Sequence, residues 1–329
     1  ILFVNPSVLG AAGMDKNAVL LATALGAGIV SIMMGLFVNY PLVLAPGMGL
    51  NAFYAFTVVQ GMGVPWQTAL GAVFISGLIF ILLTVTQVRQ LLVEAIPLSL
   101  KYAITAGIGL FITIIGLKLS GLMQIRLSLL PETLAKIMAA RGNGTPLPVE
   151  TIIELGKVAD PRILLTLLGL LIIALLMARG VRGAMLIGIL VTTLTGILIG
   201  TVQVPPGFTA IAPPDLSRNA FLQLDIMGAL HMGLLTIIFT FTFVELFDTM
   251  GTLVGTASKA GLMDKQGRFP LLGRAMFVDA TGVSLGALLG TSTITAYIES
   301  AAGIAAGART GLAAIAAGVM FLLSVFFTP

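Results

Sequence analysis

The sequence predicts an all-α polytopic membrane protein, and three observations carry that prediction. Of the 329 residues, 58% are hydrophobic and only 9% are charged, and the mean hydropathy is +1.10. A soluble domain carries about 25% charged residues, so this composition is typical of a chain that lies in a lipid bilayer. The apolar residues gather in runs of about 20, the length that a helix needs to cross a bilayer. Glycine is abundant, at 39 residues, as expected where membrane helices pack closely.

Ten segments are long enough to be spans, and a stub at residues 1–4 brings the expected total to about eleven. The segments are 18–38, 41–59, 67–86, 102–117, 163–178, 184–202, 227–256, 275–289, 291–308 and 310–327. The chain opens on ILFVNPSVLG, without a basic leader, and ends on FLLSVFFTP. We therefore expect a fragment that lacks part of its first span and several spans at its end.

The connections between the spans carry most of the charge. The longest, 120–161, contains ARGNGTPLPVE and is predicted to be a solvated loop with a short amphipathic helix at 131–140. Nine Lys and Arg residues fall on one predicted side of the membrane. The other side has two, or eight if those around this loop are included. The nine are Arg89, Lys101, Arg179, Arg182, Lys259, Lys265, Arg268, Arg274 and Arg309. The excess predicts that this side is the inner one and that segment 18–38 begins outside.

Composition also excludes several kinds of site. The chain has no cysteine, which rules out disulfides, thiolate metal sites and cysteine nucleophiles. With His231 as its one histidine, it can form neither a histidine-rich metal site nor a credible Ser/His/Asp triad. The net charge of +4 is spread thinly, which indicates membrane topology rather than a nucleic-acid surface. We expect no metal, no cofactor and no nucleic-acid partner.

Two of the predicted spans have sequences that do not suit a uniform helix. They are NYPLVLAPGMGLNAFYAF, residues 39–56, and GTSTITAYIESAAGIAAGART, residues 290–310. Each begins with Pro, Thr or β-branched residues and then becomes rich in Gly and Ala. Irregular backbone at membrane depth is tolerated where it is buried in protein or lines a cavity. A pair of broken spans is a sequence signal for a transporter binding site.

Four acids lie in or near predicted spans: Glu245, Asp248, Asp279 and Glu299. An ionised side chain at the bilayer centre costs about 2.5–3.5 kcal/mol on insertion scales. Glu245 and Asp248, in FTFVELFDTMGTLVG, stand at i and i+3 on one helix face. Two carboxylates this close in a low dielectric should not both ionise, so the pair can hold a proton. Helix capping or bonding to a neighbouring helix is the structural alternative for each.

Other polar and aromatic residues in these segments are weaker candidates. Asn51, in APGMGLNAF, could bond across helices or contact a ligand. Phe53 and Tyr54 could pack in the core or stack on a planar ligand. For Asp279, in FVDATG, a structural role is favoured over a place in a proton path.

The motifs APGMGLNAF, FVELFDTMGTLVG and GTSTITAYIESAAGIAAGART resemble those of the AzgA-type permeases for adenine, guanine and hypoxanthine, relatives of the nucleobase/ascorbate transporters. The resemblance covers essentially the whole chain. It implies a fourteen-span fold of inverted seven-span repeats, with a short strand in each of the two broken spans. On that pattern, residues 1–88 and 225–329 form two parts of a core domain. Residues 89–224, with the external loop 120–161, form the first part of a gate domain whose remaining spans are absent.

The resemblance also implies roles for individual residues. Glu245 and Glu299 would hold the base, with Asn51, Phe53 and Ile298 as further substrate contacts. Glu245 and Asp248 would carry the coupling proton. The implied function is import of hypoxanthine, guanine or adenine by proton symport and alternating access across the cell membrane. The implied partners are the purine nucleobase, the proton and the lipid bilayer, with a homodimer as a candidate assembly. At position 245 the family often has Asp instead of Glu.

Other functions stay open at this stage. The same fold could carry uracil or xanthine. An inorganic anion is disfavoured because the expected pocket is acidic. An intramembrane enzyme that uses two acids would need them on facing helices, and no protease motif accompanies Asp248 and Glu299. A channel would need a continuous polar pore, which broken helices with buried acids fit less well.

Overall fold

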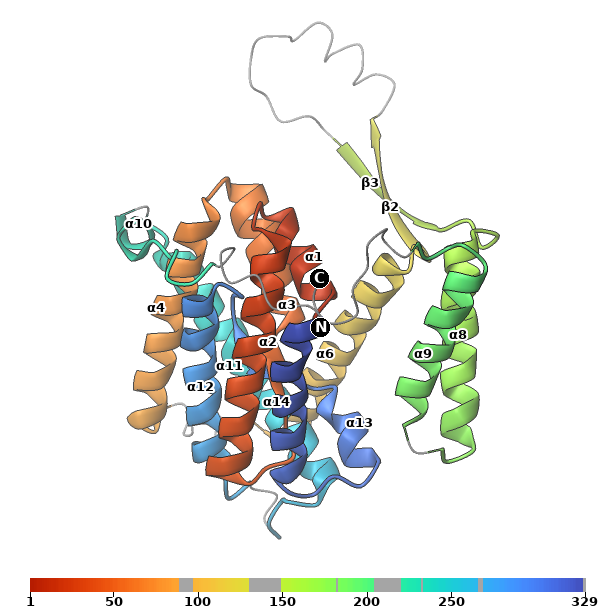
Figure 1. The fold of residues 1–329 in the computed structure, drawn as a ribbon. Helices are drawn as coiled ribbons and strands as arrows, with labels where there is room; N and C mark the ends of the chain where they lie inside the picture. The colour runs from red at the N-terminus through yellow and green to blue at the C-terminus, as the bar shows by residue number, and fades with distance from the viewer. Residues whose placement is uncertain are drawn as a thin grey trace, which may run out of the picture. The chain divides into compact units, whose positions relative to one another are not determined.

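The computed structural model describes residues 1–88, 97–129, 149–181, 183–203, 220–231, 233–265 and 269–327. The chain divides into two compact units, each described by itself (Figure 1). The first unit is Ile1–Gly109 with Phe208–Pro329, and the second is Leu110–Gly207. Helix α6 (Leu98–Leu119) crosses the boundary between them.

The first unit is a helical bundle that contains two short strands. Its first half holds α1 (Val4–Ala11), α2 (Lys16–Met33), the π-helix η1 (Met34–Val38), β1 (Leu44–Pro46), α3 (Met48–Ala52), the π-helix η2 (Phe53–Gly61) and α4 (Trp66–Val85). Its second half holds α10 (Ile226–His231), α11 (Leu235–Ala260), α12 (Leu272–Leu289), β4 (Ile294–Ala296), α13 (Ser300–Ala305), α14 (Leu312–Ser324) and the 3₁₀ turn η3 (Val325–Phe327).

Helix caps are visible at several ends of these segments. Asp15 accepts hydrogen bonds from the backbone N–H groups of Asn17 and Ala18, each at 2.9 Å, and so caps the start of α2. Helix α11 ends at Ala260, and the next residue, Gly261, has a φ of 71°, in the left-handed region that glycine adopts without strain. These local signals determine where α2 begins and where α11, the helix that carries Glu245 and Asp248, ends.

The prediction of a helical membrane protein is confirmed at this level. In the described part of the chain, five helical segments are long and apolar enough to cross a membrane. They are Lys16–Val38, Trp66–Val85, Pro161–Ala178, Leu235–Ala260 and Leu272–Leu289. The expected fourteen-span repeat and the expected domain division stay predictions.

The two broken spans meet through their strands. β1 and β4 pair antiparallel, with Leu44 opposite Ala296 and Pro46 opposite Ile294. The pairing continues past both strands, because Gly47 N–H donates to the Thr293 carbonyl at 3.2 Å and Tyr297 N–H to the Val43 carbonyl at 3.0 Å. These bonds satisfy backbone groups that a helix would otherwise have satisfied within itself. The sequence prediction that each broken span holds a short strand is therefore confirmed.

Small residues let the helices approach closely. Figure 1 shows the dark blue α14 beside the red α2, and the two helices contact each other directly. A Cβ added at Gly318 on α14 would lie 2.7 Å from the Gly28 carbonyl oxygen on α2. Only glycine fits this approach of one backbone to another.

The second unit corrects the expected loop at 120–161. It holds α8 (Pro161–Ala178), α9 (Ala184–Leu198) and a hairpin of two antiparallel strands, β2 (Met123–Leu129) and β3 (Val149–Leu155). The segment was expected to be a solvated loop with a short helix, and the structure instead has a strand at each end of it. MQIRLSL alternates apolar and polar residues with the period of a strand, a signal that the prolines and glycines nearby outweighed. The helix expected at 131–140 lies outside the described residues.

Candidate functional site

The candidate site lies where α11 passes the paired strands of the two broken spans. The best-placed acid is Asp248, which is partly exposed. A Cβ added at Gly47, between β1 and α3, would lie 3.7 Å from Asp248 Oδ2 and 3.6 Å from Thr293 Oγ1. The Asp248 carboxylate therefore stands beside the junction of strand and half-helix in the first broken span. Glycine at position 47 leaves room there, because an added Cβ would be 2.7 Å from the Thr295 methyl group.

Glu245 lies one turn earlier on α11 and is buried, with 1% of its surface exposed. Its Oε1 accepts a long hydrogen bond of 3.4 Å from the Thr249 hydroxyl. The same hydroxyl donates to Asp279 Oδ2 at 2.8 Å. A hydroxyl has one proton, so Thr249 cannot donate to both carboxylates at once. The three residues form one hydrogen-bonded group between α11 and α12.

Asp279 on α12 connects this group to strand β4. Its Oδ1 accepts from the backbone N–H of Ala296 at 2.9 Å and from the Thr295 hydroxyl at 3.0 Å. Asp279 is fully buried, and its two oxygens receive at least three donors. These contacts are those of a buried acid that holds a strand in place, the role that the sequence favoured for it.

Ile298 and Glu299 are the second and third residues after β4, with Tyr297 between them and the strand. Glu299 is exposed, Ile298 is half-buried, and α13 begins at the next residue, Ser300. The sequence placed Glu299 just after a strand in the second broken span, and the structure has it there. Because Asp279 accepts a hydrogen bond from Ala296, the strand that precedes Glu299 is connected to the same network as Glu245.

Asn51 belongs to a different polar cluster. Its Nδ2 donates to Oδ1 of Asn5 on α1. Asn5 Nδ2 in turn donates to the hydroxyls of Thr23 at 2.8 Å and Thr291 at 2.9 Å, which lie 2.7 Å from each other. All four side chains are fully buried. Among the described residues, Asn51 Oδ1 has no hydrogen-bond partner, so this acceptor is left over inside the cluster.

Asn5 is the polar residue that the sequence reasoning missed. The expected stub of the first span ended at residue 4, so the asparagine of VNPS was not weighed. The signal available in the sequence was a single amide side chain among the apolar residues of ILFVNPSVLG. Its partners Thr23, Asn51 and Thr291 come from α2, α3 and the start of the second broken span, so Asn5 joins all three to α1.

The two aromatic candidates have different surroundings. Phe53 packs edge-on against Phe241 of α11, with ring centroids 5.2 Å apart and an angle of 72° between the rings. Phe241 precedes Glu245 by one turn, so Phe53 lies near the acidic face of α11. Tyr54 is buried and donates its hydroxyl to the Trp66 carbonyl at 2.7 Å. That hydrogen bond gives Tyr54 a structural role and leaves Phe53 as the aromatic candidate.

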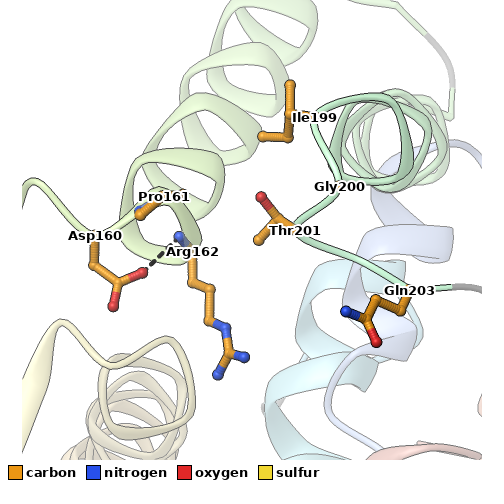
Figure 2. A pocket seen from close by; sticks show the side chains of 7 residues that line it. All are labelled: Asp160, Pro161, Arg162, Ile199, Gly200, Thr201 and Gln203. Atoms are coloured by element: carbon orange, nitrogen blue, oxygen red, sulfur yellow. Dashed lines mark hydrogen bonds between the residues drawn. The ribbon is translucent and has the colours of Figure 1, made fainter.

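The second unit has a polar pocket of its own, of about 700 Å³, shown in Figure 2. It lies between the start of α8 and the residues after α9, and is lined by Asp160, Pro161, Arg162, Ile199, Gly200, Thr201 and Gln203. The Asp160 carboxylate caps α8, since it accepts from Arg162 N–H at 2.9 Å. None of the residues predicted from sequence to bind substrate or protons lines this pocket. Over the described stretches of both units, no group of three or more His, Asp or Glu side chains could hold a metal ion.

Comparison with solved structures supports the fold. The transmembrane domain of BicA, a bicarbonate transporter from a cyanobacterium, aligns with 98% of this chain and 78% of its own, with a TM-score of 0.57 and 17% identity. At that identity the likeness concerns the fold alone. It agrees with a helical membrane transporter.

Comparison with sequences is more specific. The adenine permease AdeP of Escherichia coli is 44% identical over 329 residues, which are 100% of this chain and 68% of that protein. The guanine/hypoxanthine permease PbuG of Bacillus subtilis is 42% identical over 338 residues, which cover 100% of this chain and 72% of that protein. The model of the Permease family matches residues 1–139 and 120–329, and so covers the whole chain. The chain thus belongs to the Permease family, as an integral membrane transporter and not an enzyme.

Proposed function

We propose that this protein imports purine nucleobases, namely hypoxanthine, guanine or adenine, across the cell membrane by proton symport. The names of AdeP and PbuG support the substrate class. The observation that carries the proposal is the position of Asp248 and Glu245 on α11, next to paired strands from two broken spans. Acids at such a place are costly in a bilayer and are typical of ion and substrate pathways.

The chemistry of the site suits a purine. A purine is flat, apolar on its faces and ringed with N–H donors and N or O acceptors. Glu299 is exposed three residues after β4, where its carboxylate can accept from N–H groups in the plane of the base. Glu245 is the second proposed acceptor. Phe53 supplies an aromatic face, Ile298 an apolar contact and Asn51 an amide, and these three complete the proposed substrate contacts.

The coupling proton is proposed to reside on the Glu245 and Asp248 pair. The Thr249 hydroxyl is 2.8 Å from Asp279 and 3.4 Å from Glu245, and it can donate to only one of them. A proton on Glu245 would allow Thr249 to donate to Asp279 while Glu245 donates to the Thr249 oxygen. Proton loss would remove that second bond. The protonation state of Glu245 would thus change the hydrogen bonds of Thr249 and Asp279 and, through Asp279, those of strand β4. Such a connection is what alternating access linked to a proton requires.

Uptake of radiolabelled hypoxanthine, adenine and guanine into vesicles tests the proposal, with unlabelled purines, uracil, xanthine and inorganic anions as competitors. We expect purines to compete and uptake to fall when the proton gradient is collapsed. Glu299→Gln should raise KM about 10-fold or more, because a hydrogen bond to a charged group contributes about 1.5–3 kcal/mol. Glu154→Gln, an acid in the second unit, is the control and should transport as the wild type does.

Three outcomes would contradict the proposal. Uptake by Glu299→Gln at the wild-type KM would remove Glu299 from the substrate site. Uptake that is insensitive to the proton gradient would remove proton symport. Competition by uracil or xanthine in place of hypoxanthine, guanine and adenine would favour the alternative substrate on the same fold.

A further inference from the structure

A groove of about 750 Å³ lies in the first unit, apart from the site described above. It runs between the last turns of α2 and η1, the end of α4 and the start of α12. Its wall is mostly apolar and is formed by Met33, Phe37, Val85, Phe277 and Val278. Phe37 and Val85 are each 64% exposed, so the groove opens to the surroundings of the bundle. Its volume is within the range of about 300–1,000 Å³ that small-molecule sites have.

The polar residues of the groove include two side chains that can donate hydrogen bonds to a ligand, the Arg274 guanidinium and the Gln87 side-chain amide. Arg274, Gln87 and Thr84 line it, and no carboxylate does so among the described residues. Within the described residues, neither the Arg274 guanidinium nor the Gln87 side-chain amide makes a hydrogen bond or ion pair, although the Gln87 backbone N–H donates to the Thr84 carbonyl. The Thr84 hydroxyl donates to the Phe80 carbonyl at 2.7 Å, which leaves its oxygen as an acceptor. Arg274 is in the first turn of the 18-residue helix α12, whose dipole adds positive potential there.

The groove is at one end of the bundle. η1 ends at Val38, α4 ends at Val85 and α12 begins at Leu272, and Figure 1 shows these ends together at the lower edge of the first unit. This is the end that the Lys and Arg distribution predicts to face the inner side of the membrane. An apolar groove with donors at one end, located where a bilayer changes from hydrocarbon to head groups, matches an amphipathic ligand with an anionic head.

We propose that this groove binds an anionic phospholipid of the inner leaflet. The phosphodiester accepts from the Arg274 guanidinium and the Gln87 amide, and a hydrocarbon chain lies along the apolar wall. Guanidinium groups bind phosphate oxygens with short, charge-assisted hydrogen bonds. Basic pockets between membrane helices on the cytoplasmic side are known sites for anionic head groups. A free phosphate ion would leave the apolar wall unused, and a zwitterionic lipid would bring a cation beside Arg274.

Lipid retention tests this proposal with the full chain purified in detergent. Native mass spectrometry would count the phosphatidylglycerol molecules bound after titration, beside phosphatidylcholine and diacylglycerol of the same chain length. We expect phosphatidylglycerol to bind at least about 5-fold more tightly than either. Arg274→Gln should weaken phosphatidylglycerol binding about 5- to 10-fold, close to the effect of about 1 kcal/mol for one basic residue at a membrane surface.

The matched control is Lys259→Gln, which removes one positive charge from the same end of the bundle but not from the groove. It should leave phosphatidylglycerol binding unchanged. Val85→Trp, which fills the exposed side of the groove, should weaken binding of phosphatidylglycerol. Glycerol 1-phosphate, which has the head group but no hydrocarbon chain, should show no measurable binding to the wild type. Equal effects of Arg274→Gln and Lys259→Gln would overturn the proposal, as would tight binding of glycerol 1-phosphate. Melting temperatures measured without added lipid identify any variant that is misfolded.

Discussion

Asp279 is a carboxylate whose buried position is explained by its donors. Two hydroxyls and one backbone N–H point at its oxygens, from α11 and from β4. It therefore fixes the strand that precedes Glu299 and connects it to the helix that carries Glu245. In this arrangement a residue that need not contact substrate still determines where two proposed substrate residues stand.

Asp279→Asn should destabilise the protein. An asparagine keeps one acceptor oxygen, and its NH₂ group would face donors from Thr249 or from Ala296 and Thr295. We expect a loss of about 2–3 kcal/mol, because buried donors are left without an acceptor. The measurement is thermal or denaturant unfolding of the purified protein in detergent.

The control for Asp279→Asn is Asp225→Asn. Asp225 also accepts from one backbone N–H, that of Gly228 at 2.8 Å, and from one hydroxyl, that of Thr68 at 3.2 Å, but it is exposed. Water can replace these partners, so its loss should be below about 1 kcal/mol. Equal losses for the two variants would show that Asp279 does not hold β4 as proposed.

The sequence could predict the acids but not the network around them. Glu245, Asp248 and Glu299 stand out because each is costly in an apolar segment. Asn5 does not stand out, because an asparagine near a chain end has no such cost until its partners are known. Its hydrogen bond to Thr291 joins residues 286 positions apart, and no local pattern encodes a contact of that kind.

At the scale of elements, the paired broken spans determine the site. The sequence predicted both breaks from their Pro, Thr and Gly residues, and the structure confirms a strand in each. The pairing of Ala45 with Thr295 could not be predicted, because strand register depends on how the two halves pack. The β2–β3 hairpin was missed for a different reason. β2, MQIRLSL, alternates apolar and polar residues, but β3, VETIIEL, does not, and the prolines and glycines between them favoured a loop.

Gly318 tests the packing between two of these elements. Gly318→Ala should destabilise the bundle by about 1–3 kcal/mol, since its Cβ would lie 2.7 Å from the Gly28 carbonyl oxygen and overpacking costs that much. Gly303→Ala in α13 is the matched control, because an added Cβ there meets no atom within 4 Å. It should leave the unfolding temperature unchanged or raise it, as alanine favours a helix more than glycine does. A Gly318→Ala protein as stable as the wild type would contradict the close packing of α2 and α14.

At the scale of the whole molecule, composition was the strongest predictor. A charged fraction of 9% and a hydrophobic fraction of 58% identify a membrane protein whatever the order of residues. The orientation in the membrane is harder to predict from sequence. Nine Lys and Arg residues lie on the predicted inner side, against two on the outer side, or eight if the long connection 120–161 is counted. The structure adds an independent constraint on which helix ends share a side.

Hydrogen bonds place several ends of the first unit together. Gln60 donates to the Ala11 carbonyl at 2.6 Å, just before α2 starts, and Asp225 N–H donates to the Gln67 carbonyl at 2.9 Å, where α4 starts. The starts of α2, α4 and α10 are therefore at one end of the bundle. Helix α11 follows α10 and has 26 residues, or about 39 Å at 1.5 Å per residue, so Lys259 near its far end is at the opposite end.

Single cysteines at Asn17 and Lys259 can test this orientation, because the chain has no cysteine of its own. Both residues are exposed. A membrane-impermeant maleimide should label Asn17→Cys in intact cells and Lys259→Cys only after the cells are made permeable. This follows because the excess of Lys and Arg places Lys259 inside. The reverse pattern would invert the topology and would move the groove at Arg274 to the outer leaflet. Labelling of both cysteines in intact cells would contradict the assignment of α11 as a membrane-spanning helix.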